Sequence, residues 1–540
     1  MKKTINNRFR KEIKLTAIAT LLACAAVVNA TDYTSAIVLN GTTQTFQDGD
    51  SITAPTGVAL HLLNGATATT VDPSTDTLTI NSLASYGINV EDSTVNLGTV
   101  DITAATRGID IAGNSTVSIG NNSIIRAIAQ NAVVVRVNSS FHAGDDLTLI
   151  SDNTTNVPLL VMGGTVVIGN RATISSVNAN TAGSSLTIGD YFTLSAGDFR
   201  VTGSIASIGN EAIFNAGIRA TAGSQITFTE NARITATNYA VYANASKIDL
   251  GVGANVTSNE EYALFATGIG GEIVADRGTF TGKVAGIVLA PSGKITLTDS
   301  VVTGEIGAAL QNAVLGSPAT ELNIIGGSIT STTDSLFTFN DIAHRDGGIV
   351  INITDGAVLT GGNGEILNST RENATSFVEM NVFDSEINGT INSDGGLTVK
   401  IADSTWTSTG SSSMDNLILD KTIIEFNMTS ASDSITVGNL TLEGQSAVFV
   451  GFTNDFLEEV LATGLMDNLD ASIVTSFLGG DGNVKYIFAT SNDEGSTWDI
   501  FNYGDGRFGI SAINIVPEPS TYALIFGALA LAFATYRRRK

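Results

Sequence analysis

The chain has 540 residues, of which 43% are hydrophobic and only 15% are charged, and its formal net charge is −25. That hydrophobic content is too high for a disordered chain, and so acidic a protein is unsuited to nucleic acid, because phosphate binding requires a basic surface. A single cysteine excludes a disulfide framework and a cysteine-based zinc site.

The N-terminus has the layout of a secretory signal peptide. Six basic residues lie within the first 14 positions, residues 15–28 are apolar, and Val28-Asn29-Ala30 supplies small residues. We therefore predict residues 1–30 as a signal peptide that signal peptidase cleaves after Ala30 during general secretion. Two alternatives stay open. One is a short membrane anchor, although the run is too short to span a bilayer. The other is a lipoprotein, because Leu21-Leu22-Ala23-Cys24 resembles a lipobox and would leave Cys24 acylated.

The body, residues 91–450, carries an internal repeat, and residues 31–90 form its N-terminal cap or first turns. A six-residue pattern recurs in the order small, any, apolar, polar, apolar, glycine. Its instances begin at Ser93, Ser115, Gly164, Ser184, Ser204, Ser224 and Ser246, with the region of Gly144 as a weaker member. A spacing of 20–25 residues, combined with strand alternation, is typical of a solenoid.

Three apolar strands per repeat predict a right-handed parallel β-helix. Position by position, the repeats stack into inward columns: Val166, Leu186, Ala206, Ile226 and Ile248; Ile168, Ile188, Ile208, Phe228 and Leu250; Ala172, Phe192, Ala212, Ala232 and Ala254; Ile174, Leu194, Phe214, Ile234 and Val256. A third pair is interpreted as Phe199/Val201 and Tyr239/Val241. The observed period gives roughly 15 turns, and the crossover rule favours right-handed winding. A leucine-rich repeat is excluded, because its Leu-Asn ladder and helices are missing.

The turns between strands are expected to depend on glycine and asparagine residues. Glycine corners, and the asparagines Asn114, Asn170, Asn210 and Asn231, are expected to supply positive φ or a close approach. The repeat pattern ends before residues 451–515. Short helices are predicted there at 455–461 and 469–478, and strands at 485–489 and 498–501. We interpret them as a small mixed C-terminal cap that covers the open strand edges, with Trp498 in its core.

The C-terminus combines three elements in order. Pro517-Glu518-Pro519 cannot be helix interior, residues 522–536 are apolar, and Arg537, Arg538, Arg539 and Lys540 end the chain. We predict a transmembrane helix whose terminal cations act as a stop-transfer signal and stay cytoplasmic. The alternative is a hydrophobic helix docked on its own domain.

Residues 516–540 resemble a PEP-CTERM sorting signal, also called the ice-binding protein C-terminal domain. The resemblance implies a Gram-negative bacterium in which an exosortase-like membrane peptidase recognises Pro517, Glu518 and Pro519 and cleaves near them. The body would pass through the inner membrane, be anchored transiently by the C-terminal helix and reach the cell surface or extracellular matrix. The body also resembles autotransporter passengers in texture, but the chain ends in a short helix rather than a transmembrane β-barrel.

Candidate catalytic residues are sparse. Parallel β-helices include polysaccharide lyases and hydrolases, whose sites need clustered carboxylates with basic groups or Ca²⁺. His344-Arg345-Asp346, with Asp341 nearby, is the best polar cluster, against the alternative of an exposed loop. Asp145-Asp146 and Glu260-Glu261 are further candidate carboxylate pairs, and we interpret Asp145-Asp146 as a solvated corner. His61 and His142 are isolated in the sequence. We assign no catalytic, cofactor-binding or metal-binding residue and expect no enzyme.

An ice-binding face is disfavoured, because its threonine array is missing: the outward column Val167, Thr187, Ser207, Thr227, Asp249 is mixed. The sequence therefore favours a secreted, exosortase-processed β-solenoid with a structural or adhesive role, and extracellular polysaccharide is a candidate partner. The alternative is a polysaccharide-active β-helix enzyme.

Overall fold

The structure is a computed structural model that describes residues 30–340, 347–369, 376–428, 433, 435–442, 447–452, 497–502 and 508–513. Every regular element in these residues is a β-strand, and the strands are numbered β1 to β53. They form a parallel β-solenoid of about 16 turns, which confirms the predicted all-β fold. The right-handed winding stays a prediction. The chain divides into two compact units, one ending at Thr235 and the other beginning at Ala236.

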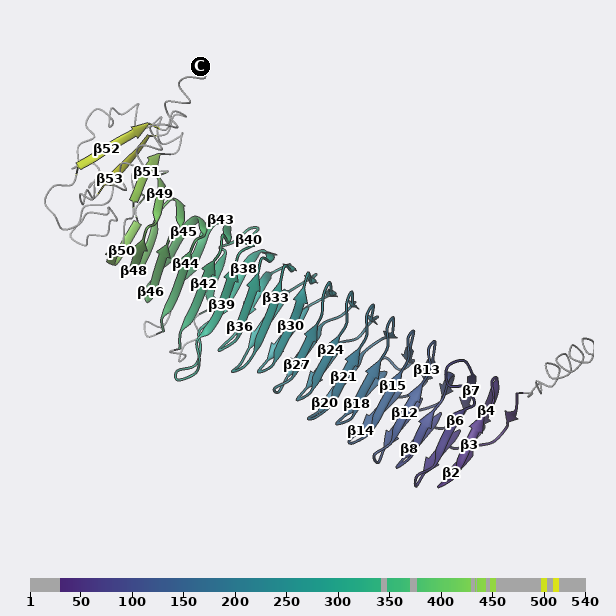
Figure 1. Cartoon of the computed structure of the whole chain (residues 1–540). Helices are drawn as coiled ribbons and strands as arrows, with labels where there is room; N and C mark the ends of the chain where they lie inside the picture. Colours follow the sequence, from purple (N-terminus) through teal and green to yellow (C-terminus); the bar gives the residue numbers. More distant parts are fainter. Residues whose placement is uncertain are drawn as a thin grey trace, which may run out of the picture. The chain divides into compact units, whose positions relative to one another are not determined.

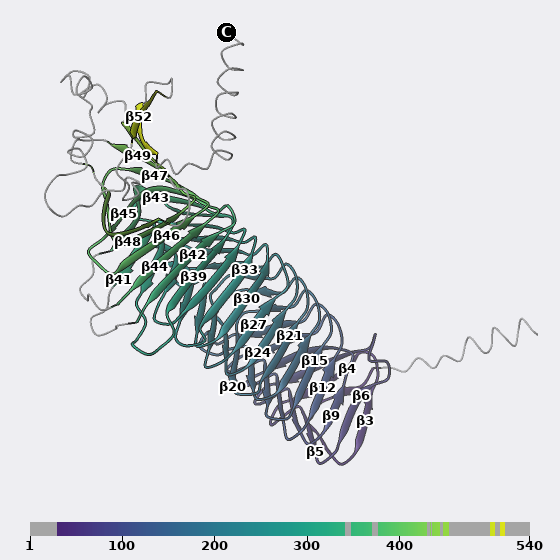
Figure 2. The same ribbon diagram turned by 60° about the vertical axis from the view of Figure 1, so that its left-hand side comes forward.

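Each turn of the first unit carries three strands, and each strand pairs in parallel with the strand three places later (Figures 1 and 2). The first sheet contains β9 (Thr94–Asn96), β12 (Thr116–Ile119), β15 (Ser140–Ala143), β18 (Thr165–Ile168), β21 (Ser185–Ile188), β24 (Ile205–Ile208) and β27 (Gln225–Phe228). The second sheet contains β10 (Thr99–Ala104), β13 (Ile124–Ala127), β16 (Thr148–Ser151), β19 (Thr173–Ile174), β22 (Thr193–Leu194) and β25 (Ile213–Phe214). The third contains β5 (Leu60–Leu63), β8 (Ile88–Glu91), β11 (Ile109–Ala112), β14 (Val133–Arg136), β17 (Leu159–Met162), β20 (Val177–Thr181), β23 (Phe199–Thr202) and β26 (Ile218–Thr221).

The predicted inward columns of the first unit are confirmed by the strand register. Ile168 pairs with Ile188, Ile188 with Ile208 and Ile208 with Phe228, and each of the four side chains is 2% exposed. Strand residues alternate between the two faces of a sheet, so one residue of every adjacent pair enters the core. Because each turn buries its apolar side chains only against its neighbours, stability is a sum over adjacent turns.

A cluster of phenylalanines fills the core between the three sheets of the first unit. Phe214 lies 5.5 Å from each of Phe192, Phe199 and Phe228 between ring centroids, and all three contacts are edge-on. Edge-on contacts are the favoured geometry for aromatic pairs. The four rings are fully or almost fully buried, so this cluster joins strands from all three sheets.

The corner between the first and second sheets is built by a ladder of Asn and Asp side chains. The side-chain oxygens of Asn121, Asp145, Asn170 and Asp190 each accept the backbone N–H of the corresponding residue in the next turn, at 2.7–2.9 Å. The glycine that precedes each corner makes room for this bond. A Cβ at Gly189 would lie 2.5 Å from the Asn170 side-chain oxygen.

Of the four predicted corner asparagines, Asn114 (φ 59°) and Asn231 (φ 55°) have positive φ, whereas Asn170 and Asn210 do not. There the next residue takes the left-handed conformation, with φ 57° at Arg171 and 53° at Glu211. Asn170 makes the predicted close approach instead, because its side-chain oxygen accepts the Asp190 N–H of the next turn.

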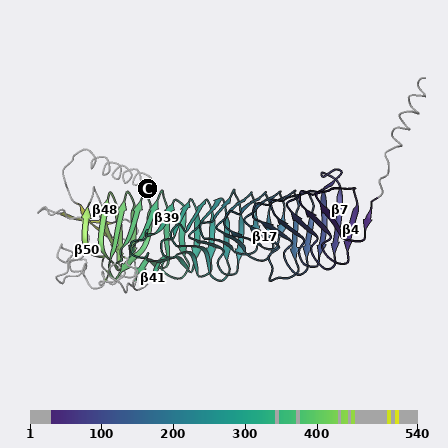
Figure 3. The same cartoon turned by 90° about the horizontal axis from the view of Figure 1, so that it is seen from below.

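The second unit continues the same parallel pairing. Its first sheet contains β30 (Lys247–Val252), β33 (Glu272–Asp276), β36 (Lys294–Thr298), β39 (Thr320–Ile325), β42 (Ile349–Thr354), β44 (Val378–Phe383), β46 (Leu397–Ala402), β48 (Ser412–Asp420) and β50 (Ile435–Leu442). Figure 3 shows β39 and β48 with the intervening strands of this sheet. Its third sheet contains β29 (Val241–Asn244), β32 (Tyr262–Thr267), β35 (Ala285–Leu289), β38 (Ile306–Gln311) and β41 (Phe337–Asn340).

Two predictions need correction in this unit. The inward pair on β29 is Val241 and Ala243, which are fully buried, whereas Tyr239 is only half-buried and precedes the strand. Three strands per turn also do not persist. β43 (Val358–Ser369) pairs with both β40 (Ser328–Ser331) and β41, so one long strand replaces two short ones. Gly361, Gly362 and Gly364 lie within β43 at this bend, where glycine eases the turn.

At the C-terminal side of this unit the pairing becomes antiparallel. β51 (Ala447–Phe452) pairs with β53 (Phe508–Ile513), and β53 pairs with β52 (Thr497–Asn502), which includes the predicted strand at 498–501. The other predicted elements of residues 451–515 lie outside the described residues.

Candidate functional site

The strongest polar cluster from the sequence, Asp341 with His344-Arg345-Asp346, lies outside the described residues. So do Cys24, Pro517, Glu518, Pro519 and the terminal cations Arg537, Arg538, Arg539 and Lys540. The residues on either side of the predicted signal cleavage, Ala30 and Thr31, are described and exposed. In the part of the chain that the structure describes, no helix is long and apolar enough to cross a bilayer.

Asp145 and Asp146 lie at a corner, as predicted, but they are half-buried and paired rather than only solvated. Arg171 of the following turn binds Asp146 in a bidentate ion pair, with Nε–Oδ1 at 2.8 Å and Nη2–Oδ2 at 2.6 Å, and it reaches Asp145 at 3.3 Å. The Arg171 hydrogen bond lowers the pKa of Asp146 below its usual value. Since Asp145 also accepts the Asn170 N–H, both carboxylates are engaged in joining turns.

The remaining sequence candidates do not form a reactive group. Glu260 is exposed, and Glu261 is half-buried with its Oε2 lacking a hydrogen-bond partner. His142 is exposed on the outer face of the first sheet. His61 contacts the amide of Asn89 at 3.0 Å. Among the described residues, no three His, Cys, Asp or Glu side chains lie close enough together to hold a metal ion.

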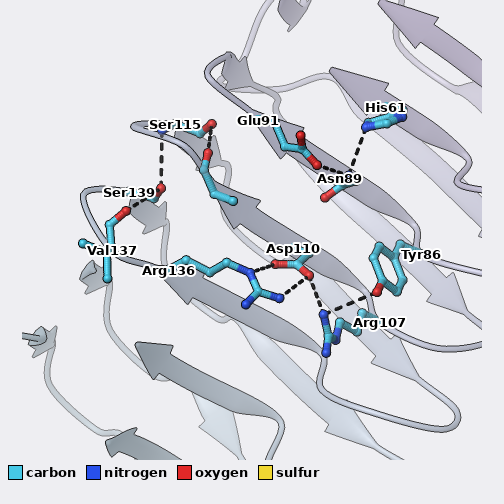
Figure 4. Close-up of polar contacts among 11 residues, drawn as sticks. His61, Tyr86, Asn89, Glu91, Arg107, Asp110, Ser115, Arg136, Val137 and Ser139 are labelled. Atoms are coloured by element: carbon cyan, nitrogen blue, oxygen red, sulfur yellow. Dashed lines mark hydrogen bonds and ion pairs between the residues drawn. The ribbon is translucent and has the colours of Figure 1, made fainter. Parts of the chain in front are cut away.

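A charged cluster lies on the outer face of the third sheet in the first unit, and Figure 4 shows it in close-up. Asp110 is only 4% exposed although it points away from the core, because two arginines cover it. Arg136 binds it through Nε at 2.9 Å and Nη2 at 3.0 Å, and Arg107 binds it at 2.5 Å. The Arg107 guanidinium also lies 5.3 Å from the ring centroid of Tyr86, a cation–π geometry.

The strand register explains how the chain assembles this charged cluster. His61, Asn89 and Asp110 occupy one outward column on β5, β8 and β11. Arg136 ends β14, the strand paired directly with β11, and lies two residues beyond Val134, the register partner of Asp110 (Figure 4). The hydrogen bond with Asp110 raises the pKa of Arg136 above its usual value. Both carboxylate oxygens of Asp110 are engaged by guanidinium groups, so the cluster joins neighbouring turns of the sheet.

Further polar side chains lie near the charged cluster (Figure 4). Asn89 donates to Glu91 at 3.1 Å as well as contacting His61. Ser115 and Ser139, also drawn in Figure 4, belong to the small-residue column of the repeat. The Ser115 N–H donates to the Ser139 hydroxyl at 3.4 Å, which joins two turns. These serines therefore explain why the repeat begins with a small polar residue.

An aromatic patch lies on the third sheet of the second unit. It consists of Tyr239, Tyr242, Tyr262 and Phe265, all of which are half-buried. Tyr242 and Phe265 are register partners on β29 and β32, with ring centroids 5.2 Å apart. Tyr239 stacks on Phe265 at 5.5 Å with 28° between the ring planes, and it also lies 5.5 Å from Tyr262. Sheet alternation directs Tyr242 and Phe265 outward, since Val241 and Leu264 fill the core.

Neither surface was assigned from the sequence. The prediction places Tyr239 inward and so misses the aromatic patch, although Tyr-x-x-Tyr at 239–242 and Tyr-x-x-Phe at 262–265 recur one turn apart. Recurrence of aromatic residues at outward positions is the signal that could have revealed it. The charged cluster offers no such signal, because Arg107, Asp110 and Arg136 occupy unrelated positions of their repeats.

Comparison with known proteins gives no relative for the chain. No protein-family model, curated protein or solved structure matches it. Function is therefore inferred from the chain's own surfaces and ends.

Proposed function

We propose that the chain is an exported β-solenoid of the cell surface or extracellular matrix, with a structural or adhesive role, and that its aromatic patch binds neutral polysaccharide. The observation that carries the proposal is the patch itself, because its four half-buried aromatic rings contact one another and two of them, Tyr242 and Phe265, lie on the outer face of the third sheet. A contiguous apolar patch at the surface is typical of an interaction site.

The chemistry of the patch favours a neutral, hydroxyl-rich polymer. Aromatic rings contact the apolar faces of sugars, and tyrosine adds a hydroxyl that exchanges hydrogen bonds with sugar hydroxyls. The chain carries a net charge of −25, and a negative field repels anionic polymers. Rings fixed on paired strands also lose little conformational entropy when they bind.

Export is supported by the two ends of the sequence. The signal-peptide pattern ending at Ala30 and the resemblance of residues 516–540 to a PEP-CTERM signal favour passage through the inner membrane. In this proposal an exosortase-like peptidase recognises Pro517, Glu518 and Pro519 and releases a body that was transiently anchored by the C-terminal helix. A parallel solenoid suits such a location, because its stability comes from many adjacent turns.

Binding is tested by measuring the affinity of the purified body for amylose, cellulose and a β-1,3-glucan, with alginate as the anionic comparison. The double variant Tyr242→Ala/Tyr262→Ala should weaken binding to the preferred neutral polymer roughly tenfold or more, because two contact rings are removed. Tyr191→Ala is the matched control, since Tyr191 is 52% exposed but lies at a corner of the first unit. No binding to any neutral polymer, or equal losses in both variants, would contradict the proposed ligand.

The same incubation separates the adhesive proposal from the enzymatic alternative. The polymer is recovered and its chain length is measured after prolonged contact with the protein. Unchanged length with retained binding supports an adhesive role. Progressive shortening would favour a polysaccharide-active enzyme.

Export is tested separately by replacing Pro517, Glu518 and Pro519 with alanine in the native host. The variant should stay in the membrane fraction at its unprocessed C-terminal mass, whereas the wild-type body should be found outside the inner membrane without residues 522–540. Pro73→Ala, a proline change within the body, is the control. Normal release of the triple variant would contradict a role for these three residues in sorting.

A further inference from the structure

We propose that removal of residues 1–30 completes the first turn of the solenoid, because the new α-ammonium group of Thr31 becomes the charged partner of the buried carboxylate of Asp50. This inference rests on the signal cleavage in the proposed function. It concerns the effect of that cleavage on the folded first turn, not on export. Cleavage would then be a step in folding as well as in export.

The carboxylate of Asp50 is buried at the beginning of β4 (Asp50–Ala54). The residue is 1% exposed, and both of its oxygens are engaged by backbone donors. The Thr31 nitrogen donates to Oδ1 at 2.6 Å, and the Gln47 nitrogen donates to Oδ2 at 2.8 Å. One of these two donors is thus the nitrogen that the predicted cleavage after Ala30 would free.

Asp50 has no cationic side chain as a partner in the described part of the first unit. The ion pairs of that unit join Asp110, Asp145, Asp146, Asp152 and Asp198 to arginines. A buried carboxylate without a counter-charge is costly, and a charged donor stabilises it more than a neutral amide does. The Asp50 carboxylate of the first turn therefore lacks a positively charged partner as long as Thr31 is linked to Ala30.

The chemistry of cleavage supplies the missing charge without any other reactant. Water breaks the bond between the Ala30 carbonyl carbon and the Thr31 nitrogen. The hydroxyl of the water leaves Ala30 with a carboxyl group, the Thr31 nitrogen gains the remaining hydrogen, and the carboxyl proton passes to the new amine. The product is a carboxylate on the released peptide and an ammonium group on Thr31, at the atom that already contacts Asp50.

The backbone around Thr31 is held in place independently of this bond. The Thr31 carbonyl accepts the Ser51 N–H at 2.9 Å, and β1 (Asp32–Tyr33) pairs with β4 through Asp32 and Ser51. The Ser51 hydroxyl donates to the Asp32 side chain at 2.6 Å, and Tyr33 packs edge-on against Phe46 at 5.9 Å. Because a residue spans about 3.3–3.8 Å, cleavage one position earlier or later would move the ammonium group away from the carboxylate.

The test uses the full chain expressed in its host, with the exported protein purified and its first residue determined by N-terminal sequencing. One variant carries an extra alanine between Ala30 and Thr31, chosen so that Thr31 stays an internal amide after processing. Asp50→Asn is made with and without this insertion, and Asp101→Asn is the control, because Asp101 is an exposed residue of the same unit. Hydrogen exchange of the β4 amides reports the first turn directly, and the thermal midpoint reports the whole unit.

We expect the wild-type protein to begin at Thr31. The insertion and Asp50→Asn should each speed β4 exchange roughly tenfold or more, and the two changes together should have no greater effect than either alone. Asp101→Asn should leave exchange unchanged. A different first residue, or losses that add, would overturn the inference while leaving export intact. An exported chain that keeps residues 1–30 would contradict both the inference and the proposed signal cleavage.

Discussion

Gly189 illustrates why a solenoid corner constrains single residues. Its missing side chain lets the Asn170 oxygen accept the Asp190 N–H at 2.9 Å. A Cβ at this position would lie 2.5 Å from that oxygen and 2.8 Å from the Gly169 carbonyl carbon. These contacts are far shorter than van der Waals distances, and the carbon belongs to the backbone of the neighbouring turn.

Gly189→Ala should therefore lower the free energy of unfolding of the first unit by about 1–3 kcal/mol, the usual cost of overpacking. Thr187→Ala is the control, because Thr187 lies two residues away and is exposed. Urea denaturation followed by circular dichroism measures both. Equal midpoints for the two variants would show that the corner tolerates a side chain.

The pair Arg171 and Asp146 gives a prediction about pH. The hydrogen bond from Arg171 lowers the pKa of Asp146 in the folded state, so the pair stabilises the fold above the unfolded value of about 3.9 and loses this contribution as the pH falls below it. Arg171→Gln should raise the Asp146 pKa toward that value, which an NMR titration of its side-chain carboxyl carbon would detect. The control is Arg126→Gln, whose partner is Asp152 and which should leave Asp146 unchanged.

At the level of the strand, alternation predicted which residues enter the core. Phe214 is fully buried on β25, and its neighbour Ile213 is 41% exposed. Register then brought Phe214 against Phe192 and Phe228, which lie in neighbouring turns. The columns in the sequence revealed these positions, because the repeat length is constant between residues 164 and 229.

Phe214→Ala should destabilise the first unit by about 3–5 kcal/mol, since it removes a buried ring and leaves a cavity. Ile213→Ala should change stability by no more than about 0.5 kcal/mol, as is usual for an exposed position. The two midpoints of urea denaturation decide the matter. Similar losses would mean that the two residues had been assigned to the wrong faces of the strand.

Strand patterns failed where the period changed. β43 replaces the second and third strands of a turn. The glycines in residues 358–369 fit a bend within one strand as well as a turn between two strands, so the local sequence does not distinguish them. Tyr239 was misplaced for a similar reason: the turn before β29 shifts the inward pair to Val241 and Ala243. Partners such as Asp110 and Arg136 are distant in sequence, so only the register of whole turns reveals them.

In the second unit, a ladder of asparagine side chains on a sheet face joins successive turns, as the Asn and Asp ladder does at the corner of the first unit. Asn352 donates to Asn323 at 2.8 Å, and Asn381 donates to Asn352 at 3.1 Å, each across one turn. Stacked amides pair identical positions of successive strands, as in other in-register parallel arrangements. The looser repeats of this unit are therefore still joined turn by turn.

At the scale of the whole molecule, the core and the outer surfaces both depend on the parallel register of successive turns. This arrangement creates the columns of the core, the corner ladder and the outward rows that carry the charged cluster and the aromatic patch. The sequence predicted the stacking because the repeat is regular, whereas the outer surfaces depend on residues that the repeat does not constrain. Of the two predicted address signals, residues 1–29 of the signal peptide 1–30 and all of the sorting signal 516–540 lie outside the described residues.

Cysteine cross-linking in the first unit tests this register most directly. Thr187 pairs with Ser207, and Ser207 pairs with Thr227, so neighbouring positions are separated by about 4.8 Å and positions two turns apart by about twice that distance. In a chain with Cys24→Ser, the pair Thr187→Cys/Ser207→Cys should form a disulfide rapidly under mild oxidation, and Thr187→Cys/Thr227→Cys should not. Equal rates for the two pairs, or a disulfide only between positions 187 and 227, would contradict the parallel stack.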